Sequence, residues 1–180
     1  MISVLQKIVM GIDHFTEFAG KLVSWVTVLL VLVVFYDVVT RYFFNYTTVA
    51  TIELEWHLFS LIFLLGAGYA LKHDRHVRVD VFYTRFSEKK KAMINLTGSL
   101  LFLIPFCAIV IYAALPFVQN SYSISETSPD PGGLPGRFVI KGAIVIGFSL
   151  LLIQAIGELL RNLLIITRKS SGTIHKPSDR

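Results

Sequence analysis

The apolar run from Leu58 to Leu71 constrains the fold more than any other stretch, because Ser60 is its only polar side chain. Acidic residues precede the run, and a basic cluster that begins at Lys72 follows it. At helical rise, residues 54–71 span about 27 Å, which is close to the hydrocarbon thickness of a bilayer. The run therefore predicts one transmembrane helix.

The composition is that of a membrane protein along the whole chain. Hydrophobic residues make up 54% of the sequence and charged residues 16%, and the mean hydropathy is +0.65. In an ordinary soluble domain about a quarter of the residues are charged. The formal net charge is +5, but the bases lie in segments that flank apolar runs, where membrane orientation explains them. We therefore expect an integral membrane protein that does not bind nucleic acid.

Three further apolar segments complete the expected architecture. We expect an all-α membrane protein whose four transmembrane helices cover about 22–39, 54–71, 94–118 and 138–160, in a single domain of residues 1–167. Apolar side chains at helical spacing in residues 2–21 predict an amphipathic helix on the cytoplasmic interface, with a cleaved signal peptide as the alternative. Residues 168–180 lack apolar periodicity, and we expect a disordered cytoplasmic tail there.

The distribution of bases predicts the orientation. If both termini are cytoplasmic, the inner segments hold fourteen of the 17 Lys and Arg residues, against Arg41, Arg137 and Lys141 outside. Cytoplasmic segments carry an excess of Lys and Arg, so the opposite orientation would invert the bias. We expect a multi-pass membrane protein with both termini in the cytoplasm.

A candidate polar cluster lies at the external ends of the first two spans. Asp37 precedes Arg41 by one helical turn, so the two side chains share a face and can form an ion pair. An acid within a span is a functional candidate, but the nearby arginine favours a structural role. We predict a cluster that ties the first span to the second and consists of Asp37, Arg41, Glu53 and Glu55.

Small residues give two spans faces along which another helix can approach closely. In the second span Gly66 and Ala70 are four residues apart, and in the fourth span Ala143 and Gly147 have the same spacing. Small residues scattered over a lipid-facing helix are the alternative. We predict helix-packing and partner contacts at Trp56, Gly66, Ala67, Ala70, Ala143 and Gly147.

The loop after the second span is the most basic segment and is therefore predicted to be cytoplasmic. Between residues 76 and 82, valines alternate with charged side chains, which indicates an extended strip, although a surface helix that begins near Asp80 is also open. Bases at the membrane surface attract anionic lipids at about 1 kcal/mol each. We expect lipid or partner contacts from Lys72, Arg75, His76, Arg78 and Asp80.

The longest external connection, residues 119–137, contains a run rich in Pro and Gly. Such a run cannot form a helix and favours a stiff turn with defined bends, with a plain linker as the alternative. We expect an external contact surface formed by Pro129, Asp130, Pro131, Gly132 and Gly133.

The last two spans depart from uniform apolar helices. Pro105 and Pro116 each remove a backbone donor, which predicts a bent third span. In the fourth span Lys141 can reach the outer interface, and Glu158 and Arg161 are neighbours on one face.

No catalytic or metal-ligating constellation stands out in the sequence. There is no nucleophile–base pair and no phosphate-binding glycine loop. His73 and His76 lack partner ligands at zinc spacing, and only His57 lies near a span. The single cysteine, Cys107, lies in an apolar run. We expect no enzymatic activity and no cofactor, and because the internal repeats of a self-sufficient carrier are missing, we expect a role in support of another membrane protein.

Several segments also carry a family resemblance, in order and spacing over nearly the whole chain: RYFFN at 41–45, EW at 55–56, GAGYAL at 66–71, HVRVD at 76–80 and PDPGGLP at 129–135. The placement of HVRVD just after the second of four spans is the most specific of these. In these segments the chain resembles the small membrane subunit of tripartite ATP-independent periplasmic (TRAP) transporters.

The resemblance implies a scaffold subunit in the bacterial inner membrane with two protein partners. One is a large membrane subunit that carries the substrate and sodium sites and moves like an elevator; since this chain ends after the fourth span, that subunit is expected to be a separate chain. The other is a periplasmic binding protein that captures a small organic anion. Sodium ions are then expected in the large partner and no cofactor in this chain. An autonomous four-helix channel or a redox-anchor subunit is the alternative.

Overall fold

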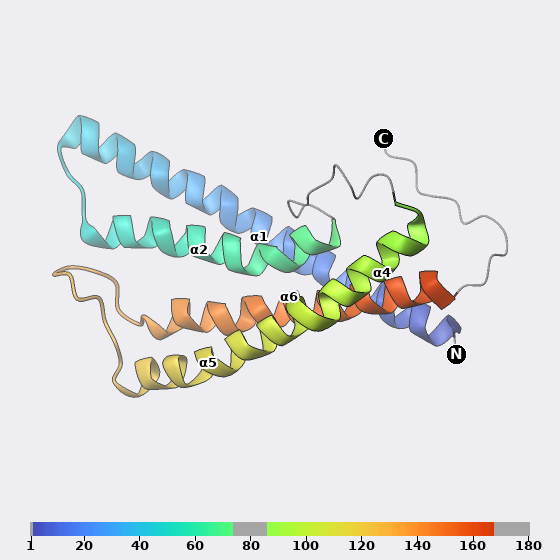
Figure 1. The fold of residues 1–180 in the computed structure, drawn as a ribbon. Coiled ribbons are helices and arrows are strands. Elements are labelled where there is room, and N and C mark those ends of the chain that lie inside the picture. The colour runs from blue at the N-terminus through green and yellow to red at the C-terminus, as the bar shows by residue number, and fades with distance from the viewer. Residues whose placement is uncertain (1, 74–85, 168–180) are drawn as a thin grey trace.

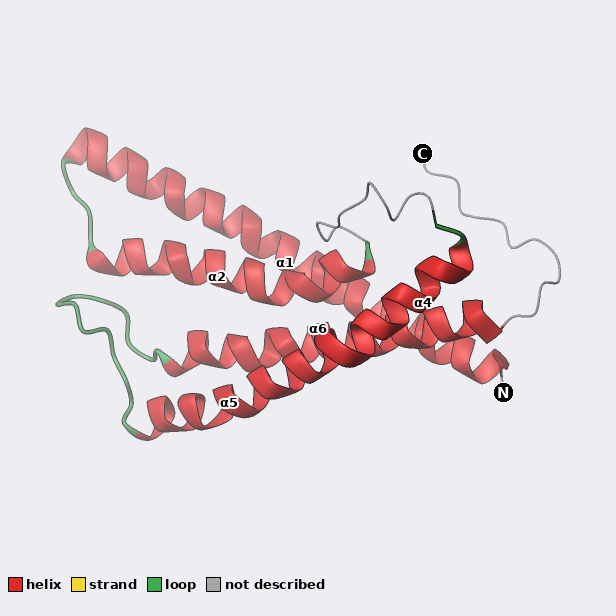
Figure 2. Ribbon diagram, viewed as in Figure 1, coloured by secondary structure: helices red, strands yellow, loops and turns green. Residues whose placement is uncertain are grey.

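The fold is entirely helical in the described residues, 2–73 and 86–167, of a computed structural model. Figure 2 shows only helices and loops. The elements in chain order are α1 (Ile2–Phe44), α2 (Val49–Lys72), α4 (Glu88–Gly98), the π-helical segment η1 (Ser99–Leu103), α5 (Ile104–Ser123) and α6 (Phe138–Thr167). The predicted all-α class is confirmed.

In the part of the chain that the structure describes, four helices are long and apolar enough to cross a membrane: α1, α2, the continuous α4–η1–α5 and α6. This confirms the predicted number of spans. Each helix extends beyond its predicted range, because helical hydrogen bonding continues through the polar residues at the edges of the apolar segments. The second helix, for example, begins at Val49, where the side chain of Thr48 accepts a hydrogen bond from the backbone N–H of Thr51 and caps the helix.

The N-terminal segment differs from its expected form. We predicted a separate interfacial helix over residues 2–21, whereas α1 runs unbroken from Ile2 to Phe44. Two close approaches show where the first half of α1 packs. A Cβ at Gly20 would overlap the ring of Tyr69 in α2, and a Cβ at Gly157 in α6 would lie 2.9 Å from the Ile12 side chain. The first half of α1 therefore packs on two other helices.

Helix α6 is the centre of the bundle and contacts α1, α2, α4 and α5. In Figure 1, α1 lies beside α2 and α5 beside α6. The buried stripe of α6 repeats every four residues, at Ala143, Gly147, Leu151 and Ala155. Leu151 and Ala155 join Leu71 and Cys107 in the most buried apolar cluster.

Glycine lets the backbones of α2 and α6 approach each other closely. A Cβ at Gly147 would lie 2.7 Å from the carbonyl oxygen of Leu64, and a Cβ at Gly68 would lie 3.2 Å from that of Leu150. By contrast, a Cβ at Gly66 would lie 3.8 Å from Val23 of α1, an ordinary contact. The close-packing glycine of the second span is thus Gly68 and not Gly66.

The third span leaves α geometry where the first of its prolines enters. In η1 the backbone N–H of Ile104 bonds the carbonyl of Ser99, five residues back, and Pro105 follows in the first turn of α5. Single π turns accommodate local changes in the hydrogen-bond ladder. Pro116 lies inside α5, which continues to Ser123.

Candidate functional site

One group of polar side chains connects three helices at the end of the bundle where α1 begins and α2 and α6 end. Arg161 of α6 donates from Nη2 to both carboxylate oxygens of Asp13 in α1, at 2.7 and 2.6 Å, and from Nη1 to Glu158. Gln154, which has no exposed surface, donates to Asp13 at 3.3 Å and accepts from the hydroxyl of Thr16 at 2.7 Å. The polar face of α1 is therefore matched by a polar face of α6.

Helix α2 joins the same group through its last turn. The ammonium of Lys72 donates to the carboxylate of Glu17 at 2.6 Å and to the backbone carbonyl of Asp13 at 2.9 Å. His73 Nε2 lies 3.2 Å from Glu17. We call the set the inner network: Asp13, Thr16, Glu17, Lys72, Gln154 and Arg161.

Lys72 differs from its sequence-based assignment, since its ammonium bonds α1 instead of pointing to lipid head groups. The first span was expected to begin near residue 22. Helix α1 begins at Ile2 instead, and it therefore places Glu17 beside the end of α2. The other residues predicted to contact lipid or a partner in this loop, Arg75, His76, Arg78 and Asp80, lie outside the described residues.

At the opposite end, a single carboxylate holds the external loop. Glu53 is buried on α2 and accepts hydrogen bonds from the Ser128 hydroxyl at 2.5 Å and from the Leu134 backbone N–H at 2.6 Å. A Cβ at Gly133 would lie 2.8 Å from a Glu53 oxygen, so only glycine fits there. We call Glu53, Ser128 and Leu134 the outer cluster.

The Pro/Gly run forms a defined turn around the outer cluster. The Gly133 N–H bonds the carbonyl of Asp130 at 3.0 Å, and the Ser128 N–H bonds that of Leu134 at 3.1 Å. Gly132 has φ of 79°, a left-handed conformation that favours glycine. The turn also contains Pro129 and Pro131, so all five residues assigned to an external contact surface lie in one ordered turn.

The predicted four-residue polar cluster does not form as a unit. The structure brings together Asp37 and Arg41, and Thr47 donates to Asp37 at 2.8 Å. Glu53 instead faces the external loop, because the Ser128 hydroxyl and the Leu134 N–H bond its carboxylate. Glu55 makes no ion pair with Arg41, and its Oε1 is buried without a hydrogen-bond partner among the described residues.

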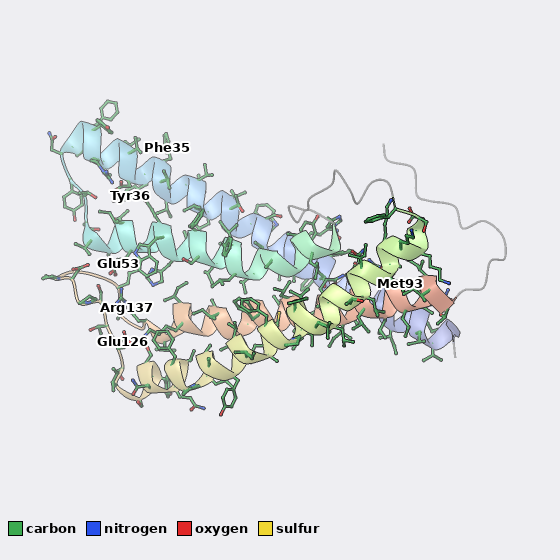
Figure 3. All side chains as sticks on the ribbon, viewed as in Figure 1. Phe35, Tyr36, Glu53, Met93, Glu126 and Arg137 are labelled. Carbon is green, nitrogen blue, oxygen red and sulfur yellow. The ribbon has the colours of Figure 1, made fainter. Side chains whose placement is uncertain are left out.

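This end of the bundle also contains a second ion pair and two contacts between a cation and an aromatic ring. Lys141 donates to Glu126, and its ammonium lies 4.0 Å from the ring centroid of Phe117. The hydrogen bond from Lys141 lowers the pKa of Glu126 below its ordinary value. The guanidinium of Arg137 lies 5.9 Å from the ring centroid of Trp56. Figure 3 shows Glu53, Arg137 and Glu126 gathered near the start of α2, the external loop and the start of α6.

The small-residue positions have internal roles. Ala143 and Gly147 are buried against α2, and Ala67 packs against the apolar cluster around Leu151. Ala70 is partly buried on α2. Trp56, Phe35 and Tyr36 are exposed, and the last two lie on α1 in Figure 3.

The sequence analysis missed Asp13, Thr16, Glu17, Gln154 and Gly68. Asp13 and Glu17 lie in the segment that was expected to form an interfacial helix, and both face the side of α1 that α2 and α6 cover. The sequence does contain a signal for this contact, because the segments that form α1 and α6 both carry polar residues at helical spacing and their charges are opposite. Among the described residues no group of three or more His, Cys, Asp or Glu side chains could hold a metal ion.

A comparison with protein families gives one match. The model of the family described as tripartite ATP-independent periplasmic transporters, DctQ component, matches residues 30–164, which is more than half of the chain and reaches into all four spans. The matched range includes the outer cluster and begins after Asp13, Thr16 and Glu17 of the inner network. No curated protein matches the chain.

Proposed function

Because this chain belongs to the DctQ family, the small membrane component of TRAP transporters, we propose that it serves as a fixed scaffold for a large membrane subunit. The family and the four membrane-spanning helices make it a multi-pass inner-membrane protein and a transport component. It supplies no substrate site of its own in this proposal. Its work is to hold its four helices in one arrangement beside the subunit that moves.

The observation that carries the scaffold role is the bracing of the bundle at both ends and in the middle. The inner network joins α1, α2 and α6, and the outer cluster joins α2 to the loop that leads into α6. Between them, the Gly147 backbone packs directly on Leu64. An elevator-type carrier moves one domain against a fixed one, so a braced bundle is suited to the fixed part.

The partners follow from the family. We propose that the large subunit takes up a small organic anion together with sodium ions, and that a periplasmic binding protein delivers the anion. The external turn around the outer cluster is a suitable surface for that protein, since its backbone is already ordered by Glu53 and needs little further ordering on contact.

The orientation can be tested with cysteine labelling. The native Cys107 is fully buried, so its background reaction with an impermeant maleimide should be low. We expect Asp130→Cys to react in sealed cells and Lys89→Cys to react only after the membrane is opened. The reverse pattern would invert the proposed topology.

The scaffold role is tested by sodium-driven uptake in proteoliposomes that contain the binding protein and the large subunit, with and without this chain. We expect uptake only when the chain is present. Full uptake in its absence would overturn the scaffold role. Flux or a haem spectrum with this chain alone would instead support an autonomous channel or a redox anchor.

A further inference from the structure

An unassigned groove runs between α2 and α6 at the outer end of the bundle. It encloses about 260 Å³, and its lining includes Trp56, Ser60, Leu64, Arg137, Lys141 and Ile144. The buried carboxylate of Glu53 does not line it. The groove combines a charged mouth with an apolar floor.

The mouth of the groove is cationic. Arg137 and Lys141 line it, and no acidic side chain does. Lys141 is engaged by Glu126, whereas Arg137 makes no ion pair within residues 2–73 and 86–167 and lies over the face of Trp56. Glu53 and Glu126 lie close enough to sense the charge of Arg137, but they accept hydrogen bonds from Ser128, Leu134 and Lys141. The donors of the guanidinium are therefore free for an anion.

The floor of the groove is apolar and leads toward the middle of the spans. From Trp56 to Leu64 the lining follows α2 for eight residues, about 12 Å at helical rise. Ser60 adds no free donor there, since its hydroxyl bonds the carbonyl of Trp56. An inorganic anion would use only the mouth, and an apolar ligand only the floor. The whole groove fits an amphiphile with an anionic head.

We propose that this groove binds one phospholipid with an anionic head group. The phosphate oxygens accept hydrogen bonds from Arg137, for which the planar guanidinium is well suited. One acyl chain lies over Leu64 and Ile144. Trp56 sits at the level of the head group, where its ring covers the start of the chain. The lipid thereby fills the groove between α2 and α6 that begins beside the contact of Gly147 with Leu64.

The experiment uses Trp56 as the reporter. Trp25→Phe leaves it as the only tryptophan, because the chain has two. The full chain is placed in phosphatidylcholine nanodiscs with rising fractions of phosphatidylglycerol, and either lipid is brominated on its acyl chain so that contact quenches the fluorescence. The fluorescence in each brominated lipid is divided by the fluorescence in the same lipid without bromine, which corrects for changes in the intrinsic emission of Trp56. We expect an association constant about fivefold higher for phosphatidylglycerol, the preference that one interfacial cation provides.

Three variants separate the groove from general attraction to the membrane. In Arg137→Gln the association constants for phosphatidylglycerol and phosphatidylcholine should become about equal. Lys89→Gln removes one exposed charge on α4 and should keep the roughly fivefold preference. Ser60→Phe fills the groove without a change of charge and should lower quenching by both lipids. If Arg137→Gln does not fold, the quenching measured in Ser60→Phe tests the proposal.

Several outcomes would overturn the proposal. Equal quenching by the two brominated lipids in the parent, or an unchanged preference in Arg137→Gln, would mean that no specific lipid is bound. Loss of the preference in excess inorganic phosphate would assign the mouth to a free anion. Loss of quenching when the large subunit is added would assign the groove to a protein contact.

Discussion

The two ends of the bundle solve the same problem in different ways. Both must place polar groups beside an apolar core. The inner network does so with side chains from three helices, and its most distant partners are 148 positions apart. The outer cluster uses one carboxylate on α2 to bind a hydroxyl and a backbone N–H of a loop. The inner end therefore fixes helix against helix, whereas the outer end fixes a loop.

This difference predicts two kinds of failure. Removal of one member of a charged pair leaves its partner without compensation, and at the inner end that partner lies on another helix. Removal of the outer carboxylate frees a loop whose backbone groups can turn to water. Damage at the inner end should thus lower the stability of the whole bundle, and damage at the outer end should stay local.

The largest effect is expected from Asp13→Ala. The change leaves Arg161 with Glu158 alone and removes an acceptor of Gln154. We expect a loss of about 3 kcal/mol, the lower end of the range for a broken buried pair, because the Asp13 and Arg161 side chains remain 26% and 34% exposed. The measurement is the unfolding midpoint in detergent titrated with sodium dodecyl sulfate.

The matched control at the inner end is Glu88→Ala. Glu88 pairs with Lys91 on the surface, and its side chain is 84% exposed. Exposed pairs contribute about 0 to 1 kcal/mol, so the midpoint should hardly move. Equal shifts for the two alanine variants would show that the inner network does not brace the bundle.

The seam between the two ends is tested by Gly147→Ala. The new methyl group would lie 2.7 Å from the Leu64 carbonyl oxygen, and a backbone atom cannot move aside without separating α2 from α6. We expect a loss of about 2 kcal/mol, typical of overpacking. Gly142→Ala on the same helix is the control, since no atom lies within 4 Å of its Cβ position. A neutral Gly147→Ala would contradict the close approach.

The sequence predicts what depends on local spacing. Apolar length predicts the four spans, and the spacing of four residues predicts the pairing of Asp37 with Arg41, which the structure forms. The Pro/Gly run likewise predicts a defined turn. Each of these inferences needs only the residues of one segment.

What the sequence does not predict is the rotation of one helix against another. Gly66 and Gly68 are both small, but which one meets α6 depends on the register of the whole pair. Asp13 and Arg161 show the same limit, since each segment reveals a polar face but not the face that it meets. Glu53 was assigned to the wrong partner because its partners include a backbone N–H, which no side-chain pattern can reveal.

A smaller and local effect is expected from Glu53→Gln. The amide oxygen can keep one of the two hydrogen bonds but not both, and a hydrogen bond to a charged group contributes about 1.5 to 3 kcal/mol. We expect hydrogen exchange at the Leu134 amide to become about tenfold faster, while the unfolding midpoint moves less than in Asp13→Ala. Glu55→Gln, which changes the acid two residues along, should leave that exchange rate unchanged. A large fall of the unfolding midpoint in Glu53→Gln would contradict the prediction that damage at the outer end stays local.

The smallest effect concerns the pH dependence of the loop beside the outer cluster. The hydrogen bond from Lys141 lowers the pKa of Glu126 in the folded state below the ordinary 4.5. The pair therefore contributes its full stability above about pH 4.5, and the contribution is lost as the pH falls through the lower folded-state pKa. We expect the parent to be slightly more stable than Glu126→Gln at neutral pH, and the difference in unfolding midpoint to vanish in acid, where the folded carboxyl is protonated. The measurement is that difference over a pH series, and a difference that grows toward acid would contradict the assigned direction of the pKa.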